Sequence, residues 1–352
     1  MTDDGRPRGG ANDADVTDPT DRTKAEVPSL AVGPDGATII PATPATEGAV
    51  TADELAIVHE HGLELKSRSQ WAYARKRFLR HRLAMASLIL LIIILGAGLF
   101  ASVIAPYTFD EIDLENSLRA PTLEDKHFFG TDFQGRDYFS RIVYGIQTSE
   151  RVAFLVAILS TLIGTTIGAI AGYYGGWVDN ILMRLTDLVL TLPGLAVLLT
   201  AAAFLGNGSQ YRVAIILALL FWTGLARIVR GSFLSLREKE YVEAAKAVGS
   251  GDTRIMLRHI LPNVVGPIVV NATLIVGIAI LTEAALSFLG FGIQPPTPAL
   301  GKLISDGQEL QDIAWWLVTF PGLTIVLIVL CINFIGDGLR DALDPTQRRT
   351  RA

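Results

Sequence analysis

Residue types that commonly carry out catalysis or bind metals occur in this sequence, but they are not gathered into a catalytic or metal-binding pattern. His59 and His61 flank Glu60, yet residues two positions apart on a helix do not face each other, so this trio is not expected to bind a metal. The single cysteine, Cys331, excludes an intramolecular disulfide framework and a cysteine-rich metal site. We therefore expect neither a catalytic centre nor a metal site in this chain.

A site for nucleotide phosphates is not expected either. The phosphate-binding loop GxxxxGK[ST] does not occur in the sequence. The nearest fragment, Gly301-Lys302, is followed by Leu303 and lacks the upstream glycine. The chain is therefore not expected to hydrolyse ATP itself.

Two polar residues, Asn271 and Glu283, lie inside a long apolar stretch of the sequence. Polar and ionisable groups within a membrane usually face protein and are often functional, so both are candidates for a substrate pathway. A structural role is the favoured alternative for each. Glu283 lies near the outer end of the stretch, where water or a loop could satisfy it, and Asn271 could donate a hydrogen bond to another helix.

The segment 227–262 has the pattern of two short helices joined by a turn. Residues 237–248 form good helix sequence, the run Gly249-Ser-Gly-Asp252 interrupts it, and a second helix over 253–260 is predicted to end at Leu261-Pro262. Asp252 or Ser250 could cap the second helix. Ala244 and Ala245 keep the surface of the first helix low, so another protein could approach closely. A solvated connector is the alternative.

The elements that position these residues are predicted to be membrane-spanning helices. The chain has 352 residues, of which 50% are hydrophobic and only 18% charged, and its mean hydropathy is +0.40. Since a spanning helix needs roughly 20 apolar residues, the charge-free stretches predict an all-α, polytopic fold with six spans. They are 83–104, Val152 to Val178, a stretch between Asp187 and Arg212, Val213–Ala226, Val264 to Phe288, and a stretch between Asp312 and Asp337. The fourth is the shortest of the six.

The flanking regions differ from these spans in composition. Residues 1–50 contain nine acids and four bases, which accounts for the whole net charge of −5, and their lack of apolar periodicity predicts a disordered tail. Residues 51–82 are predicted to be a cytoplasmic linker that ends in an interfacial basic helix. An extracytoplasmic loop over 105–150, a core over 151–340 and a C-terminal tail over 341–352 complete the predicted organisation. An acidic chain of this kind is not expected to bind nucleic acid.

The distribution of basic residues predicts the orientation in the membrane. The segment 66–82 has seven bases and 227–262 has seven bases against four acids, whereas 105–150 has nine acids against four bases. Because bases are enriched on the cytoplasmic side, both termini are predicted to be cytoplasmic, with 105–150 and 291–315 outside.

Small residues and prolines predict how the spans pack. Gly164, Gly168, Gly172 and Gly176 recur at four-residue spacing, which lets another helix approach closely. Pro193, Pro267 and Pro321 fall within predicted spans and are expected to kink them.

Several separated motifs resemble the dipeptide/oligopeptide branch of the ABC-importer permeases. Glu243-Ala244-Ala245, followed by Gly249 and by Leu261-Pro262, resembles the EAA loop of that family, with His259 as in this branch. The other matching motifs are Phe129-Gly-Thr-Asp132, Gly135-Arg-Asp137, Leu190-Thr-Leu-Pro193, the run from Glu283 to Gly292, and Pro295-Pro296. The resemblance extends from about residue 78 to residue 345.

The resemblance implies a MetI-like permease core whose EAA loop, 237–262, docks on a cytoplasmic ATPase. It assigns this coupling role to Glu243, Ala244, Ala245, Gly249, Ser250, Gly251, Asp252, His259, Leu261 and Pro262. It also implies that the region of Asp132, Arg136 and Asp137 helps to form an outer mouth where a binding protein docks.

The resemblance further implies the partners of the chain in the cell membrane. They are a second, related permease that completes a heterodimer, two ABC ATPase subunits and an extracytoplasmic solute-binding protein. No cofactor is expected in this chain, since ATP and Mg²⁺ would be bound by the ATPases. The implied cargo is di- and oligopeptides, with nickel, glutathione or oligosaccharide as alternatives. A secondary transporter or channel is less favoured, because inverted repeats or ionisable residues at the midplane would be expected there.

Overall fold

The computed structural model describes residues 70–205 and 209–343, all of which belong to one compact unit of the chain, Arg68–Ala352. These residues form helices and turns without a strand, apart from an isolated bridge between Thr131 and Asp137. The predicted all-α class is therefore confirmed. The predicted tail 1–50, the linker up to residue 69 and the last residues of the C-terminal tail lie outside the described residues.

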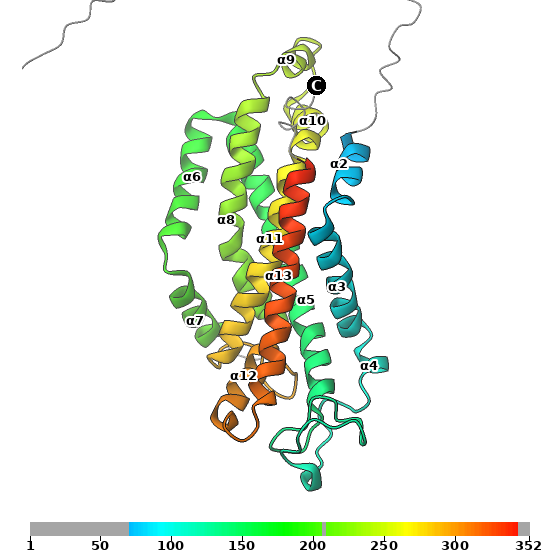
Figure 1. Cartoon of the computed structure of the whole chain (residues 1–352). Helices are drawn as coiled ribbons and strands as arrows, with labels where there is room; N and C mark the ends of the chain where they lie inside the picture. The colour runs from blue at the N-terminus through cyan, green and yellow to red at the C-terminus, as the bar shows by residue number, and fades with distance from the viewer. Residues whose placement is uncertain (1–69, 206–208, 344–352) are drawn as a thin grey trace, which may run out of the picture. The chain divides into compact units, whose positions relative to one another are not determined.

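Within the described part of the chain, five helices are long and apolar enough to cross a membrane, and a sixth crossing results if one bent helix pair counts as one span. Figure 1 shows their arrangement. The long helices are α3 (Arg82–Leu99), α5 (Tyr138–Tyr174), α8 (Gln210–Leu236), α11 (Leu261–Phe288) and α13 (Trp316–Leu343), and the bent pair is α6 (Gly176–Thr191) with α7 (Gly194–Leu205). The shorter helices are α2 (Gln70–Phe78), α4 (Ala101–Ile104), α9 (Glu240–Ala247), α10 (Asp252–Ile255) and α12 (Leu300–Gly307).

Helix α5 begins earlier than predicted, at Tyr138 instead of Val152, so residues 138–150 belong to a helix and not to the predicted loop 105–150. The carboxylate of Asp137 caps its first turn by accepting a hydrogen bond from the Ser140 amide at 2.7 Å. The Tyr138 hydroxyl then donates to the Leu317 carbonyl of α13 at 2.6 Å. These hydrogen bonds stabilise the helical conformation of the polar residues that precede the apolar stretch. A hydropathy pattern carries no information about such contacts, so it predicts a later start for the helix.

The third predicted span is broken. Helices α6 and α7 meet at Leu192-Pro193 with a bend of 85°, and α6 starts at Gly176, well before the predicted start after Asp187. Proline lacks the backbone N–H that a continuous helix needs, which explains the break. Helices α11 and α13, in contrast, continue through Pro267 and Pro321.

Helix α8 is longer than the predicted span Val213–Ala226 because its charges are paired with those of α6. Arg227 lies 2.5 Å from Asp187, and Arg230 makes two hydrogen bonds to Asp179. A bidentate pair of this kind satisfies both charges. The helix can therefore include charged residues, whereas the predicted span was defined as a stretch without charges and ended before them.

The glycine stripe of α5 packs against α8, as predicted for three of its four members. A Cβ atom added at Gly164, Gly168 or Gly172 would lie within 2.7 Å of a backbone oxygen of α8. Gly176 lies in α6 instead, and a Cβ atom there would contact nothing within 4 Å. Close packing of α5 on α8 is thus confirmed, and the prediction for Gly176 was wrong.

Helix α11 is surrounded by other helices. It packs against α5, α13, α8 and α12, while α3 lies against α13 and α5 (Figure 1). The buried side chains form two clusters. The larger lies among the long helices, and the smaller lies where α5, α8 and α11 meet the segment that contains α9 and α10. The second cluster positions the segment with the EAA-like pattern.

Candidate functional site

The segment that joins α8 to α11 lies at one end of the helix bundle, where α9 and α10 extend beyond α8 (Figure 1). The expected helix, turn and second helix are present. The second helix does not end at Leu261-Pro262, however, because α10 continues through a π-helical turn, Met256–Ile260, directly into α11. Pro262 has no backbone N–H to donate to the preceding turn, and the helical hydrogen-bond pattern changes to π-helical immediately before it. Movement of this segment is therefore connected to α11 without a break in the helix.

Three apolar side chains fix the segment to the bundle. Val242, Ile255 and Ile260 are completely buried in the smaller cluster, together with Phe233 of α8 and Val264 of α11. Each fully buried aliphatic side chain contributes on the order of 1.5–3 kcal/mol. These residues were not identified from the sequence, although apolar residues within an otherwise polar connection are a usable signal. The segment is thus a rigid extension of the bundle.

Asp252 links the segment to α5 and does not have the predicted capping role. Its carboxylate accepts a hydrogen bond from the Tyr173 hydroxyl at 2.7 Å. The cap position of α10 is Gly251, and no side chain bonds there. The ammonium group of Lys246 lies 5.8 Å from the centre of the Tyr173 ring, which adds a cation–π contact from α9. Both short helices therefore contact the end of α5.

The turn between the short helices is a Schellman motif. The Gly249 amide donates to the Lys246 carbonyl at 2.9 Å and the Ser250 amide to the Ala245 carbonyl at 3.1 Å. Gly249 has a φ of +78°, in the left-handed region that favours glycine. The backbone conformation of this turn thus explains why a glycine occupies position 249 of the EAA-like pattern.

Gly249→Ala is expected to weaken this turn by about 1 kcal/mol, because an alanine Cβ is disfavoured at positive φ. The amide of Ser250 should then exchange with solvent roughly fivefold faster in a hydrogen-exchange measurement. Gly251→Ala is the matched control, since Gly251 has a φ of −70° and open space around its Cβ position. Equal exchange rates in the two variants would contradict the assignment.

The outer surface of the segment is apolar as well as charged. Val248 is 86% exposed, Leu257 60% and Tyr241 42%. Among the residues predicted for coupling, Glu243, Ala244, Gly249, Gly251, Asp252 and Pro262 are exposed, whereas Ala245, Ser250, His259 and Leu261 are partly buried. The structure therefore brings most of the predicted residues to one exposed tip. It adds Val248, Leu257 and Tyr241, which were not predicted.

The two polar residues inside α11 are bonded to neighbouring protein groups. Glu283 is completely buried, and its carboxyl group accepts hydrogen bonds from Ser149 of α5 at 2.8 Å and from Ser287 at 2.7 Å. Helices, and not a loop, therefore satisfy it. The Asn271 side chain donates to the Pro267 carbonyl of its own helix at 2.9 Å. This bond replaces the predicted bond to another helix.

The residues predicted for the outer mouth form a compact cluster of turns and ion pairs. Asp132 is 2% exposed, pairs with Arg136 at 2.7 Å and also pairs with Arg141. Asp137 is equally buried and lies 2.9 Å from the Nδ1 atom of His127. The Asp132 carboxylate also accepts hydrogen bonds from the amides of Gln134 and Arg136, so this region consists of Asx-type turns with local ion pairs. His127, which looks isolated in the sequence, is part of this cluster.

Within residues 70–205 and 209–343, no group of three or more His, Cys, Asp and Glu side chains is placed to bind a metal ion. The exposed tip presents apolar and charged side chains on a base of buried apolar residues.

Two family models match this chain. The model described as "Binding-protein-dependent transport system inner membrane component" matches residues 164–349. The model described as "N-terminal TM domain of oligopeptide transport permease C" matches residues 69–121. Together they include all five long helices except residues 138–163 of α5.

Curated proteins are similar over most of the chain. The oligopeptide transport system permease protein OppC of Escherichia coli (strain K12) is 43% identical over 81% of this chain and 94% of its own length. The dipeptide transport system permease protein DppC of Alkalihalophilus pseudofirmus is 43% identical over 80% of this chain and 91% of its own. The glutathione transport system permease protein GsiD of Escherichia coli O6:K15:H31 is 40% identical over 79% of this chain and 91% of its own.

Proposed function

Because this chain belongs to the family of binding-protein-dependent transport system inner membrane components, we propose that it is a permease subunit of an ATP-driven importer of di- and oligopeptides. It is a multi-pass membrane protein, with five long apolar helices and a bent pair. Its role in the importer is to provide transmembrane helices whose arrangement changes during transport. The energy for this change comes from ATP hydrolysis in separate subunits.

The observation that carries this proposal is the exposed tip of the segment 237–262 on its buried base. Val248 and Leu257 expose apolar surface at the end of the bundle, while Val242 and Ile255 fix the same segment to it. Large exposed apolar side chains rimmed by polar residues are typical of protein interaction sites. Force applied to the tip by an ATPase would reach α11 through the continuous helix from Asp252.

The complete machine contains further subunits in this proposal. Two ATPase subunits bind ATP and Mg²⁺, a second, related permease forms a heterodimer with this chain, and a solute-binding protein delivers the cargo. In this proposal the tip faces the cytoplasm together with both termini, which the excess of basic residues in 227–262 supports. The cluster around Asp132 then lies on the opposite side and stabilises the outer mouth.

Peptide cargo is favoured by the two relatives that are named for oligopeptide and dipeptide transport. Glutathione is the second candidate, because a relative named for glutathione transport is 40% identical. Uptake of a labelled dipeptide, a labelled pentapeptide and labelled glutathione by a strain with and without this chain would separate them. Loss of peptide uptake alone supports the proposal, and loss of glutathione uptake alone contradicts the peptide cargo.

Val248→Asp is expected to lower ATPase binding by the permease complex at least tenfold, because it would place an unpaired charge in a desolvated contact. The measurement is the amount of ATPase that co-purifies with the tagged permease, together with uptake into proteoliposomes. Leu123→Asp is the matched control. Leu123 is 81% exposed, but it lies in the loop at the other end of the bundle.

Glu243→Lys tests the same surface by reversing an exposed charge in the first turn of α9. We expect ATP hydrolysis to continue while uptake falls, since the contact is altered and the buried base is not. Wild-type uptake by both variants would refute the docking role of the tip.

A further inference from the structure

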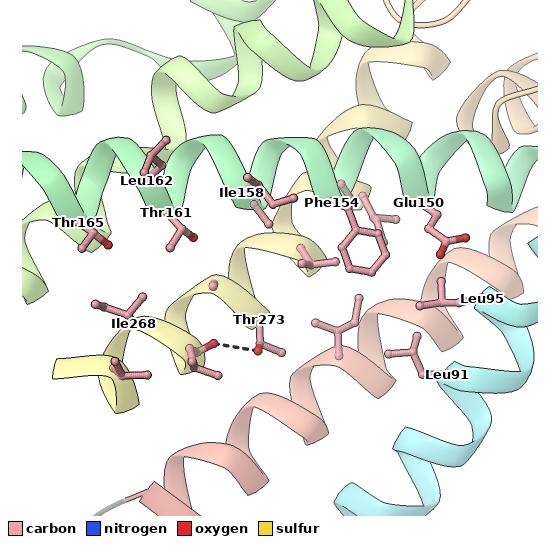
Figure 2. A pocket seen from close by; sticks show the side chains of 18 of the residues that line it. Leu91, Leu95, Glu150, Phe154, Ile158, Thr161, Leu162, Thr165, Ile268 and Thr273 are labelled. Atoms are coloured by element: carbon pink, nitrogen blue, oxygen red, sulfur yellow. Dashed lines mark hydrogen bonds between the residues drawn. The ribbon is translucent and has the colours of Figure 1, made fainter. Parts of the chain in front are cut away.

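A long groove runs between α5 and α11 on the side of the bundle that also contains α3 and α13. Its volume is about 740 Å³, and most of its lining is apolar, with Phe154 of α5, Val269 of α11, Leu91 of α3 and Ile332 of α13 as examples. Figure 2 shows side chains of α5 and α11 on the two sides of this space. None of the glycines that contact α8 lines it, so the groove is on a different face of α5.

The groove contains polar groups that the chain does not satisfy. The hydroxyl oxygens of Thr161 and Thr165 are buried and have no hydrogen-bond partner among the described residues. Glu150 lies at one end of the lining on α5, and no hydrogen bond or close ion pair joins its carboxylate to residues 70–205 or 209–343. In Figure 2 these three side chains lie on the side of α5 that faces the groove. An occupant with hydrogen-bonding groups would satisfy them, and a hydrocarbon chain would not.

The α5 side of the groove contains one stripe of small residues, beside which the larger Phe154, Ile158 and Leu162 also line the groove. Ala153, Ala157, Thr161 and Thr165 line it at four-residue spacing. Small residues at this spacing let another helix approach closely in a membrane, and threonine hydroxyls can bond across such an interface. This stripe of α5 thus has short side chains at and beside the two threonine hydroxyls that lack a hydrogen-bond partner.

The length of the groove decides between a lipid and a protein occupant. Its α11 side extends from Leu261 to Ile280, which is about 28 Å at a rise of 1.5 Å per residue. This is close to the roughly 30 Å thickness of the hydrocarbon core. A lipid acyl chain reaches through only one of the two leaflets, whereas a spanning helix reaches through both.

We propose that this groove binds a membrane-spanning helix of the second permease subunit. The helix presents small residues to Ala157 and Thr161, hydrogen-bonding side chains to the two threonines, and a basic or donor group to Glu150. The inference rests on the proposed function, which requires a second permease, and it assigns the face through which that subunit is bound.

Photo-crosslinking within the intact complex tests the occupant. A diazirine amino acid is incorporated at position 161, and at position 166 as the matched control, in a complex co-expressed with a tagged second permease. Thr166 is on the same helix, but it is exposed and does not line the groove. We expect a crosslink to the second permease from position 161 and at least tenfold less from position 166. A lipid adduct alone, a crosslink to another protein, equal yields or no adduct at position 161 would each overturn the proposal.

Filling the groove provides a second measurement. Thr161→Trp should lower the amount of co-purified second permease at least tenfold, whereas Thr166→Trp should change it less than twofold. The Thr161→Trp chain, purified alone, should melt at the temperature of the wild type if only the interface is affected. Unchanged co-purification would refute the groove as an interface while leaving the importer function intact. Failure of the wild-type chain to co-purify with any permease would instead contradict the proposed function.

Discussion

Asp132→Asn is expected to destabilise the end of the helix bundle that contains Asp132 by about 3–5 kcal/mol, because it leaves buried cations without their counter-charge. Asp132 is 2% exposed and pairs with both Arg136 and Arg141. The Arg141 side chain is itself 5% exposed, so water cannot replace the lost carboxylate. Asparagine has the same shape and keeps one acceptor for the backbone amides of the turn, so the change removes charge and little else.

The measurement for Asp132→Asn is denaturant-induced unfolding of the purified chain in detergent micelles. Asp125→Asn is the matched control in the same loop. Asp125 pairs with Arg119, but the side chains of this pair are 49% and 36% exposed. An exposed pair contributes on the order of 0–1 kcal/mol. Similar losses in the two variants would show that burial of the Asp132 cluster contributes no stability.

The sequence was sufficient to predict the parts of the fold that depend on composition. Long apolar stretches predict α3, α11 and α13 closely, since the membrane requires a certain length of apolar helix. The exposed tip was also predictable in outline, because Gly249 and the alanines before it form a local pattern. Both features depend on neighbouring residues in the chain.

The rest depends on contacts between distant residues. Helix α8 extends beyond its predicted end because Arg230 pairs with Asp179, 51 residues away in the sequence. In the same way, Asp252 bonds to Tyr173 across 79 residues and does not cap its own helix. A charged residue marks the end of a membrane-spanning helix only when no side chain of opposite charge pairs with it. Whether such a side chain is nearby is known only from the folded structure.

These long-range contacts also connect the tip to three of the long helices. The tip is fixed to α8 through Phe233, to α5 through Tyr173 and to α11 by a continuous helix. Helices α5 and α8 are in turn packed along the glycine stripe. A displacement of the tip would therefore move these three helices together.

Gly168→Ala is expected to be the most damaging of the glycine-to-alanine changes at the contact between α5 and α8, because it would separate the two helices. The new Cβ would lie against the backbone oxygen of Ala226 and 2.9 Å from the Cβ of Val229. A backbone oxygen in a helix cannot move aside as a flexible side chain can. Overpacking of this kind costs about 1–3 kcal/mol or more, and the whole contact between the two helices must adjust.

Gly224→Ala is the matched control, because it is expected to change the stability of the protein in the opposite direction. Gly224 lies in the middle of α8, is exposed, and has no atom within 4 Å of its Cβ position. Alanine is favoured over glycine in a helix by roughly 0.5–1 kcal/mol, so this variant should be slightly more stable than the wild type. Thermal unfolding of the purified chain should therefore shift in opposite directions for the two glycine-to-alanine changes. A shift in the same direction would mean that close contact at Gly168 does not hold α5 and α8 together.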